Sequence, residues 1–187
     1  WFGKAQVEGV FGMWYGKGLG ADRAHEALKL GNLEGASATG GVLAVVGDDH
    51  GGKSSVSAHQ SEQVMAAAHL PILYPASTAE IVQYGLFGYA LSRFSGLYVA
   101  LKCVTDTLDL TASIVLPDFM RAFATPTDFD MPQGGLNIRP TMAQLAQEVR
   151  VHDEALGHLV QAIDELDQAL ALDAGRGRGM LGIVARI

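Results

Sequence analysis

The amino-acid sequence predicts an α/β fold, a parallel sheet with alternating helices that is incomplete at its N-terminal side. Apolar segments of strand length alternate along the chain with segments whose apolar residues recur every three or four positions. Glycine and proline mark most of the boundaries between these segments. Alternation of this kind is typical of a parallel sheet. Strands are expected within residues 10–15, 42–46, 69–75 and 97–104, and helices within 23–30, 62–70 and 77–94.

The individual elements carry their own signals. The run at 42–46 is wholly apolar and lies close to glycines on both sides, which indicates a buried strand. Residues 77–80 have the serine and glutamate spacing of a capping box, which opens a helix. The run at 97–104 is apolar at nearly every position, as expected for a parallel strand that is covered on both faces.

A glycine-rich turn at residues 16–22 connects the first strand to the first helix. Its third glycine comes one residue too early for the dinucleotide-binding fingerprint, so the turn predicts no such site. Asp22 is expected to cap the helix at 23–30, because a carboxylate is favourable at a helix N-terminus. Lys17 is a cation at the carboxyl end of a strand, where open parallel sheets place their ligands.

The polar loop, residues 47–62, follows the second strand and ends where the next helix is expected to begin. It contains two aspartates, two histidines, one lysine and four serines. A purely structural turn does not require this concentration of acids, imidazoles and hydroxyls. The loop is therefore the main candidate for a functional site. Its candidate residues are Asp48, Asp49, His50, Ser54, Ser55, His59 and Glu62.

A phosphate-binding loop is one alternative interpretation of this segment. Residues 47–54 match Gly-x4-Gly-Lys-Ser and follow a predicted strand. Such a loop directs backbone N–H groups and one lysine toward a polyanion, whereas Asp48 and Asp49 add two negative charges there. Its helix should also start directly after Lys53, but the serine-rich residues 54–61 intervene.

The same motifs, taken in order, resemble the long fused indolepyruvate ferredoxin oxidoreductases, thiamine-diphosphate enzymes of the 2-oxoacid ferredoxin oxidoreductase class. The polar loop is similar to that family in Gly-Asp-Asp-His at 47–50, Ser-Ser at 54–55 and His-Gln-Ser-Glu at 59–62. Residues 51–53 fall where the family varies, which makes the phosphate-loop match accidental. The resemblance continues through segments 13–23 and 89–113 and covers about residues 9–116, although Leu19 and Leu30 depart from the family pattern.

The resemblance implies a thiamine-diphosphate-binding-like fold, of which this chain is the larger part of the pyrimidine-binding domain. In the family, the C2 carbanion of thiamine diphosphate, bound with Mg²⁺, attacks an aryl 2-oxoacid and carbon dioxide leaves. Electrons pass to iron–sulfur clusters and ferredoxin, and coenzyme A takes the acyl group. The implied function is oxidative decarboxylation of aryl pyruvates to aryl-acetyl-CoA.

Two roles are expected for the side chains of the polar loop. His50, Ser54 and Ser55 are expected to donate hydrogen bonds to the substrate carboxylate or carbonyl. His59 and Glu62 are expected to order the loop or to hold a proton. We interpret the remaining histidines, among them His25, His69 and His152, as structural.

Cofactor contacts are expected from Lys17, Gly18, Asp48 and Asp49, at the carboxyl ends of the first two strands. The two aspartates are expected mainly to brace the loop by accepting hydrogen bonds from backbone N–H groups. The family's activating glutamate, Gly-Asp-Gly magnesium signature and cluster cysteines are expected on other segments, so no metal ligand is assigned here and the isolated chain is expected to be inactive. Expected partners are the aryl 2-oxoacid, the remaining domains of the enzyme and further copies in a homo-oligomer.

The composition argues against several classes of protein. A net charge of −7 over 187 residues disfavours a general nucleic-acid binder. No apolar run approaches the ~20 residues that a membrane span needs. The single cysteine, Cys103, excludes an internal disulfide and is expected to be a buried strand thiol, which favours a cytoplasmic location. A non-catalytic α/β interaction module remains a further alternative.

Three regions are expected along the chain. Residues 1–116 form the pyrimidine-binding-type α/β domain, whose N-terminal part is missing, and the proline-rich residues 117–140 form a linker. Residues 141–187 form a long helix, capped by Thr141, and the first strand of a further domain. Residues spaced every three or four positions predict a packing face on that helix: Met142, Leu145, Val149, His152, Leu156, Leu159, Ile163, Leu166 and Leu170.

Overall fold

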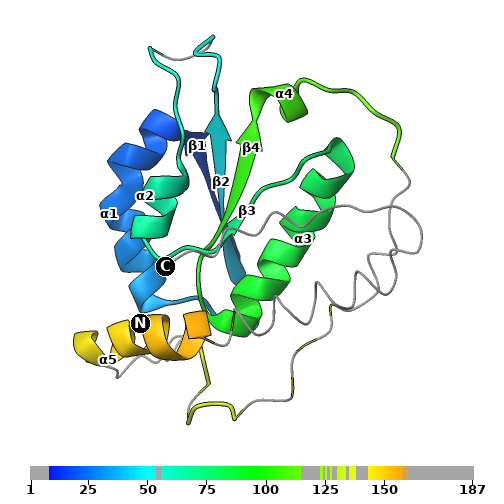
Figure 1. Ribbon diagram of the computed structural model, residues 1–187. Helices are drawn as coiled ribbons and strands as arrows, with labels where there is room; N and C mark the ends of the chain where they lie inside the picture. The colour runs from blue at the N-terminus through cyan, green and yellow to red at the C-terminus, as the bar shows by residue number, and fades with distance from the viewer. Residues whose placement is uncertain are drawn as a thin grey trace.

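A computed structural model of the chain confirms the α/β class. It describes residues 9–53, 56–114, 143–157 and 159, together with 123, 125, 127, 130–133 and 135–137. Within these residues, four strands form one sheet in the order β1-β2-β4-β3, and every pair is parallel (Figure 1). The first strand of a further domain, expected after residue 179, lies outside the described part of the chain, as does Thr141.

The elements follow the predicted alternation. The strands are β1 (Phe11–Lys17), β2 (Gly41–Asp48), β3 (Ile72–Leu73) and β4 (Val99–Val104). The helices are α1 (Gly18–Glu34), α2 (Glu62–Ala67), α3 (Thr78–Ser95), α4 (Thr105–Leu108), α5 (Gln144–Val149) and the π-helical η1 (Arg150–Ala155). No helix among the described residues is both long enough and apolar enough to cross a bilayer.

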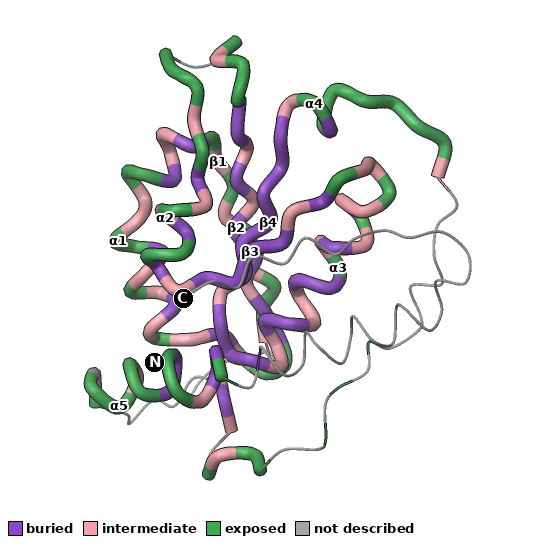
Figure 2. Tube along the Cα trace, viewed as in Figure 1, coloured by how far each residue is buried: buried purple, intermediate pink, exposed green. Residues whose placement is uncertain are grey.

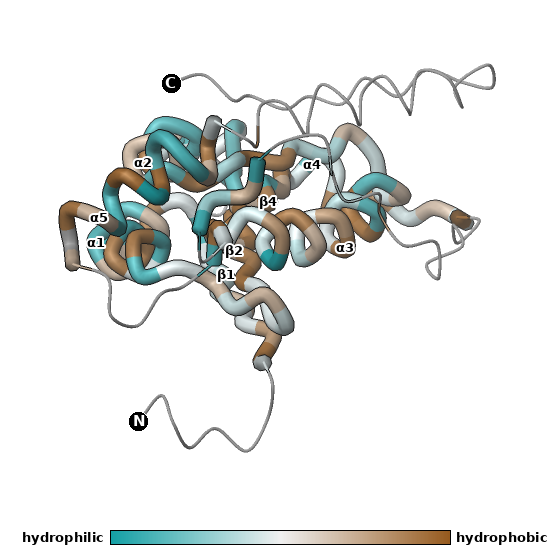
Figure 3. Tube along the Cα trace, turned by 90° about the horizontal axis from the view of Figure 1, so that it is seen from below, coloured by the Kyte–Doolittle hydropathy of each residue, from teal (hydrophilic) through white to brown (hydrophobic). Residues whose placement is uncertain are grey.

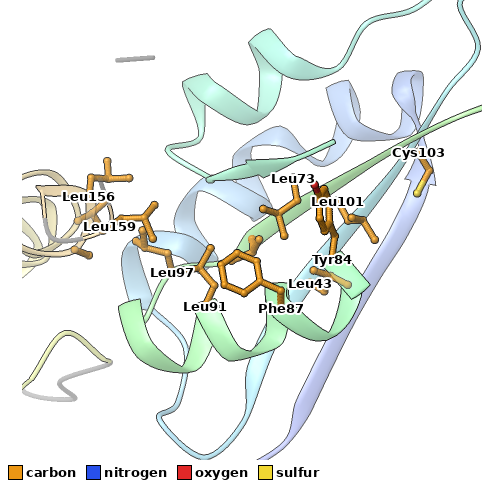
Figure 4. Packing of buried hydrophobic residues seen from close by; sticks show 13 residues of the cluster. Leu43, Leu73, Tyr84, Phe87, Leu91, Leu97, Leu101, Cys103, Leu156 and Leu159 are labelled. Atoms are coloured by element: carbon orange, nitrogen blue, oxygen red, sulfur yellow. The ribbon is translucent and has the colours of Figure 1, made fainter. Parts of the chain in front are cut away.

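The sheet lies between two layers of helix, with α1 and α2 on one face and α3 on the other (Figure 1). The two inner strands are buried along most of their length (Figure 2). The cluster on the α3 side includes Leu43, Leu73, Phe87, Leu101, Cys103 and Leu156 (Figure 4). The cluster on the side of α1 and α2 includes Ala21, Leu28, Val46, Met65 and Ala100.

Alternation along the strands decides which side chains reach the side of α1 and α2. Successive residues of a strand point to opposite faces of a sheet. In β4, Leu101 and Cys103 pack on the α3 side, whereas Ala100 packs on the other side. Lys102 therefore points toward α1 and α2, and by the same alternation so does Asp48, two residues after Val46. Two ionisable side chains of neighbouring strands thus share one face.

The predicted capping box opens α3. Ser77 Oγ accepts a hydrogen bond from Glu80 N at 3.2 Å. Glu80 Oε2 in turn accepts from Ala76 N at 2.7 Å, one residue before the position that the motif predicts. Within α3, a Cβ at Gly88 would crowd the side chain of Leu43, so the missing side chain lets the helix lie close to the sheet.

Arg150 joins the C-terminal helical segment to the amino edge of the domain, where the strands of the sheet begin. Its guanidinium is fully buried and donates to Asn32 O at 3.0 Å and Leu33 O at 3.1 Å, in the last turn of α1. It also donates to Leu136 O at 2.8 Å. A cation at this position satisfies carbonyl groups that a helix end leaves without partners. Figure 3 shows α5 beside α1.

The predicted packing face of the C-terminal helix is correct for only some of its described residues, and Met142, Ile163, Leu166 and Leu170 lie outside the described part of the chain. Leu156 and Leu159 are buried, but Leu145, Val149 and His152 are exposed. Val151 and Ala155 are fully buried instead. The reason is that η1 is wound as a π-helix, whose wider turns shift which residues face the domain.

Replacing Arg150 by Met should lower the free energy of unfolding by about 3 kcal/mol, because three carbonyl oxygens, two of them in buried contacts, lose a charged donor. Chemical denaturation monitored by far-ultraviolet circular dichroism measures this change. Arg23→Met, at an exposed position of α1, is the matched control and should change stability by less than about 0.5 kcal/mol. Equal stability of the two variants would contradict the role assigned to Arg150.

Candidate functional site

The carboxyl edge of the sheet gathers the polar residues of the chain. The strands β1, β2 and β4 end at Lys17, Asp48 and Val104, and the polar loop extends beyond the end of β2 (Figure 1). The strand end at Asp48 is buried, whereas much of the loop is exposed (Figure 2). This is the edge at which parallel α/β sheets bind ligands.

Asp48 ties the start of the polar loop to its end. Its side chain is fully buried, and its Oδ2 accepts hydrogen bonds from Ser61 N at 2.9 Å and Ser61 Oγ at 2.8 Å. Ser61 directly precedes α2, so these bonds place the helix relative to β2. Asp48 Oδ2 thereby makes the backbone contact that was expected to brace the loop.

Lys102 of β4 is the second buried ionisable residue of the site. Its Nζ lies 3.4 Å from Asp48 Oδ2 and forms an ion pair with Glu62 Oε1, at the first residue of α2. The ammonium also lies 4.7 Å from the ring centroid of Tyr74, a cation–π contact. A buried ammonium requires such partners, because its transfer from water is otherwise strongly unfavourable.

Glu62 is consequently held in its charged form. Partial burial alone would raise the pKa of Glu62, but the hydrogen bond from Lys102, backbone hydrogen bonding and the nearby positive charges lower it below its ordinary value of 4.5. Because this pKa is lowered in the folded state, the pair contributes full stability above pH 4.5. The contribution decreases as the pH falls below that value.

His59 connects the polar loop to α1. Its Nε2 lies 2.9 Å from Asp22 Oδ2, and its Nδ1 lies 3.7 Å from Asp48 Oδ1. The helix α1 begins at Gly18, so Asp22 lies in its second turn and contacts His59. The expectation that Asp22 caps a helix at 23–30 is therefore wrong.

The imidazole of His59 occupies the space above Gly18. A Cβ built at Gly18 would overlap the ring, so this close approach depends on the absence of a side chain. Gly18 was expected to contact a cofactor. In the structure it is buried, and its contact is with His59.

Some buried polar atoms of this network have no hydrogen-bond partner within the described chain. Asp48 Oδ1, His59 Nδ1 and Glu62 Oε2 are buried atoms for which the described residues provide no hydrogen-bond partner. Buried polar atoms of folded proteins nearly always have partners, so such atoms indicate water or a ligand group. All three lie at the carboxyl edge.

A small pocket lies between the start of the polar loop and the end of β4. Its lining consists of Asp49, His50, Gly51, Lys53, Val104, Thr105 and Asp106. Asp49 is buried, whereas His50 and Lys53 are exposed. The pocket thus combines two carboxylates with an imidazole and an ammonium, and it can take a polar group that carries either charge.

The predicted site residues fall into separate groups. His59 and Asp48 lie in the buried network with Lys102, and Glu62 pairs with Lys102. Asp49 and His50 line the pocket, and Lys17 is exposed at the end of β1. Ser54 and Ser55 lie outside the described residues. The phosphate-loop alternative finds no support, because α2 begins at Glu62 rather than directly after Lys53.

The sequence analysis did not recognise Asp22 as the partner of His59. It also did not assign five further residues to the site: Ser61, Tyr74, Lys102, Thr105 and Asp106. The one sequence feature that could have revealed the buried ion pair is the single lysine within the otherwise apolar strand 99–104. Cys103 is buried as expected, and burial raises the pKa of its thiol. Within the described chain, no group of three or more His, Cys, Asp or Glu side chains is placed to hold a metal ion.

Gly18→Ala should displace His59 from Asp22, because the added methyl group would overlap the imidazole. Nitrogen-15 NMR of the histidine side chains should show a changed hydrogen-bonding state of the His59 ring nitrogens. Gly20→Ala is the matched control in the same helix, where a Cβ meets no atom within 4 Å. An unchanged His59 signal in Gly18→Ala would contradict the contact.

No family model, curated protein or solved structure matches this chain. The comparisons therefore assign neither a family nor an activity. The geometry of the carboxyl edge and the motifs of the sequence are the basis for a functional proposal.

Proposed function

We propose that the chain is part of a thiamine-diphosphate-dependent indolepyruvate ferredoxin oxidoreductase and forms the pyrimidine-binding side of its active site. The observation that supports this most directly is the placement of the polar loop. Its Asp-Asp-His, His-Gln-Ser-Glu and flanking residues, which resemble that family, follow the end of β2 at the carboxyl edge of a parallel sheet.

The chain's own residues fit only part of such a cofactor. Asp48 Oδ1, His59 Nδ1 and Glu62 Oε2 are polar atoms without partners in the described chain, which suits the nitrogen-bearing aminopyrimidine ring. The family's Gly-Asp-Gly magnesium signature does not occur in this sequence, so the proposal assigns Mg²⁺ and the diphosphate to another domain. When bound, the cofactor supplies the carbanion that attacks the 2-oxo group.

In this proposal, the residues of the edge have distinct tasks. His50 and Lys53, exposed at the pocket, attract and bind the carboxylate of the aryl 2-oxoacid. Asp49 and Lys17 lie toward the cofactor at the ends of neighbouring strands. Gly18 acts indirectly, by leaving space for His59, and Asp48 Oδ2 positions Lys102. Iron–sulfur clusters and coenzyme A, bound elsewhere in the enzyme, would accept the electrons and the acyl group.

The activity assay uses the full-length polypeptide that carries this segment, purified without oxygen. With thiamine diphosphate, Mg²⁺, coenzyme A and indolepyruvate, we expect reduction of methyl viologen. His50→Ala should lower kcat/KM by about 100-fold, because a donor to the substrate is lost. Val56→Ala, at a highly exposed position of the same loop, should leave it unchanged. Absence of reduction with every aryl 2-oxoacid would overturn the proposal.

A protein-interaction module is the second candidate, and one surface favours it. On the edge strand β1, Phe11, Met13 and Tyr15 lie on one face and are 59%, 58% and 79% exposed. Exposed apolar residues along a strand edge favour association. Analytical ultracentrifugation of the chain should then show concentration-dependent association that Met13→Lys abolishes. A monomer at all concentrations would exclude this candidate.

A further inference from the structure

Two histidines from distant parts of the chain pack ring against ring at the amino edge of the domain. His69 lies in the turn after α2, and His152 lies in η1. Their ring centroids are 4.2 Å apart, with an edge-to-face angle of 70°. This contact is separate from the carboxyl edge and plays no part in the proposed reaction.

The backbone of His69 is held in place. It has a φ of 60°, in the left-handed region that non-glycine residues seldom adopt. Its carbonyl oxygen accepts a hydrogen bond from Asn32 Nδ2 at 2.9 Å, and Ala68 O accepts from the same nitrogen at 3.0 Å. Asn32 is fully buried, so this turn has a fixed position relative to α1.

The backbone of His152 is fixed in the same way. Arg150, two residues earlier, donates to the carbonyl groups at the end of α1. Val151 and Ala155 are fully buried on either side of His152 along η1. The backbones of the two histidines therefore stay close together unless the segment of α5 and η1 separates from the domain.

The charges around the pair oppose protonation. Burial, His152 and Lys29 of α1 lower the pKa of His69 below its ordinary value of 6.5, while Glu148 of α5 acts in the opposite direction. Because the folded-state pKa is lowered, the stability of the contact is fully present above pH 6.5. It decreases as the pH falls below that value, where the separated histidine binds a proton more readily.

We propose that the His69–His152 contact makes the docking of α5 and η1 sensitive to acid. Two imidazolium rings at this separation repel each other, and Lys29 adds a third positive charge. Glu148 supplies a negative charge that limits the effect. Acidification thus weakens the attachment of the C-terminal helical segment. Neither histidine belongs to the sheet, so the sheet itself should be little affected.

Hydrogen–deuterium exchange of the whole chain at about pH 5.5 and about pH 7.5, corrected for intrinsic exchange rates, tests this proposal. We expect the opening equilibrium of the segment at 143–157 to rise on the order of tenfold at the lower pH. Exchange in β2 and β4 should change far less. Equal protection of the segment at both pH values would overturn the proposal.

Variants separate charge from structure. His152→Gln and His69→Asn should remove the acid response of the segment, and Asn tolerates the left-handed conformation at position 69. Glu148→Gln should enlarge the response, because it removes the opposing charge. His50→Gln, at the other edge of the sheet, is the histidine control and should leave it intact. A wild-type acid response in His152→Gln would contradict the proposal, even if His69→Asn fails to fold.

Discussion

The carboxylate of Asp48 is the contact on which the candidate site depends. One oxygen accepts two hydrogen bonds from Ser61 and lies 3.4 Å from the ammonium of Lys102. These partners belong to the loop before α2 and to β4, so a single buried charge joins three elements at the carboxyl edge. Without it, Lys102 would keep Glu62 as its one ionic partner among the described residues.

A second buried cluster, centred on Arg150 and Asn32, performs a similar task at the amino edge. Arg150 binds carbonyl groups at the end of α1, while the side chain of Asn32 binds Ala68 O, His69 O and Tyr98 N. The domain thus has an acidic–basic network at the edge that would face a ligand and a backbone-capping network at the opposite edge. The first determines the chemistry that we propose, and the second holds the C-terminal helical segment.

Local patterns predicted the fold well, because strands and helices here are specified by short apolar runs and caps. The strand at 42–46, the capping box at Ser77 and the start of α2 at Glu62 all agree with the structure. Non-local contacts were not predictable. Asp22 has the sequence context of a cap, but its partner is His59, 37 residues away. The π-helical turn that buries Val151 and exposes His152 likewise leaves no periodic signal. The lysine inside the apolar strand β4 was not recognised as part of an ion pair, and its position alone does not say which carboxylates it contacts.

A double-mutant cycle between Asp48 and Lys102 tests the central claim most directly. Unfolding free energies of Asp48→Asn, Lys102→Met and the double variant give the coupling between the two charges. We predict a coupling of about 1 kcal/mol or more, with the double variant less destabilised than the sum of the single variants. A coupling near zero would show that the two side chains are neighbours without supporting one another, and would contradict the account of the site given above.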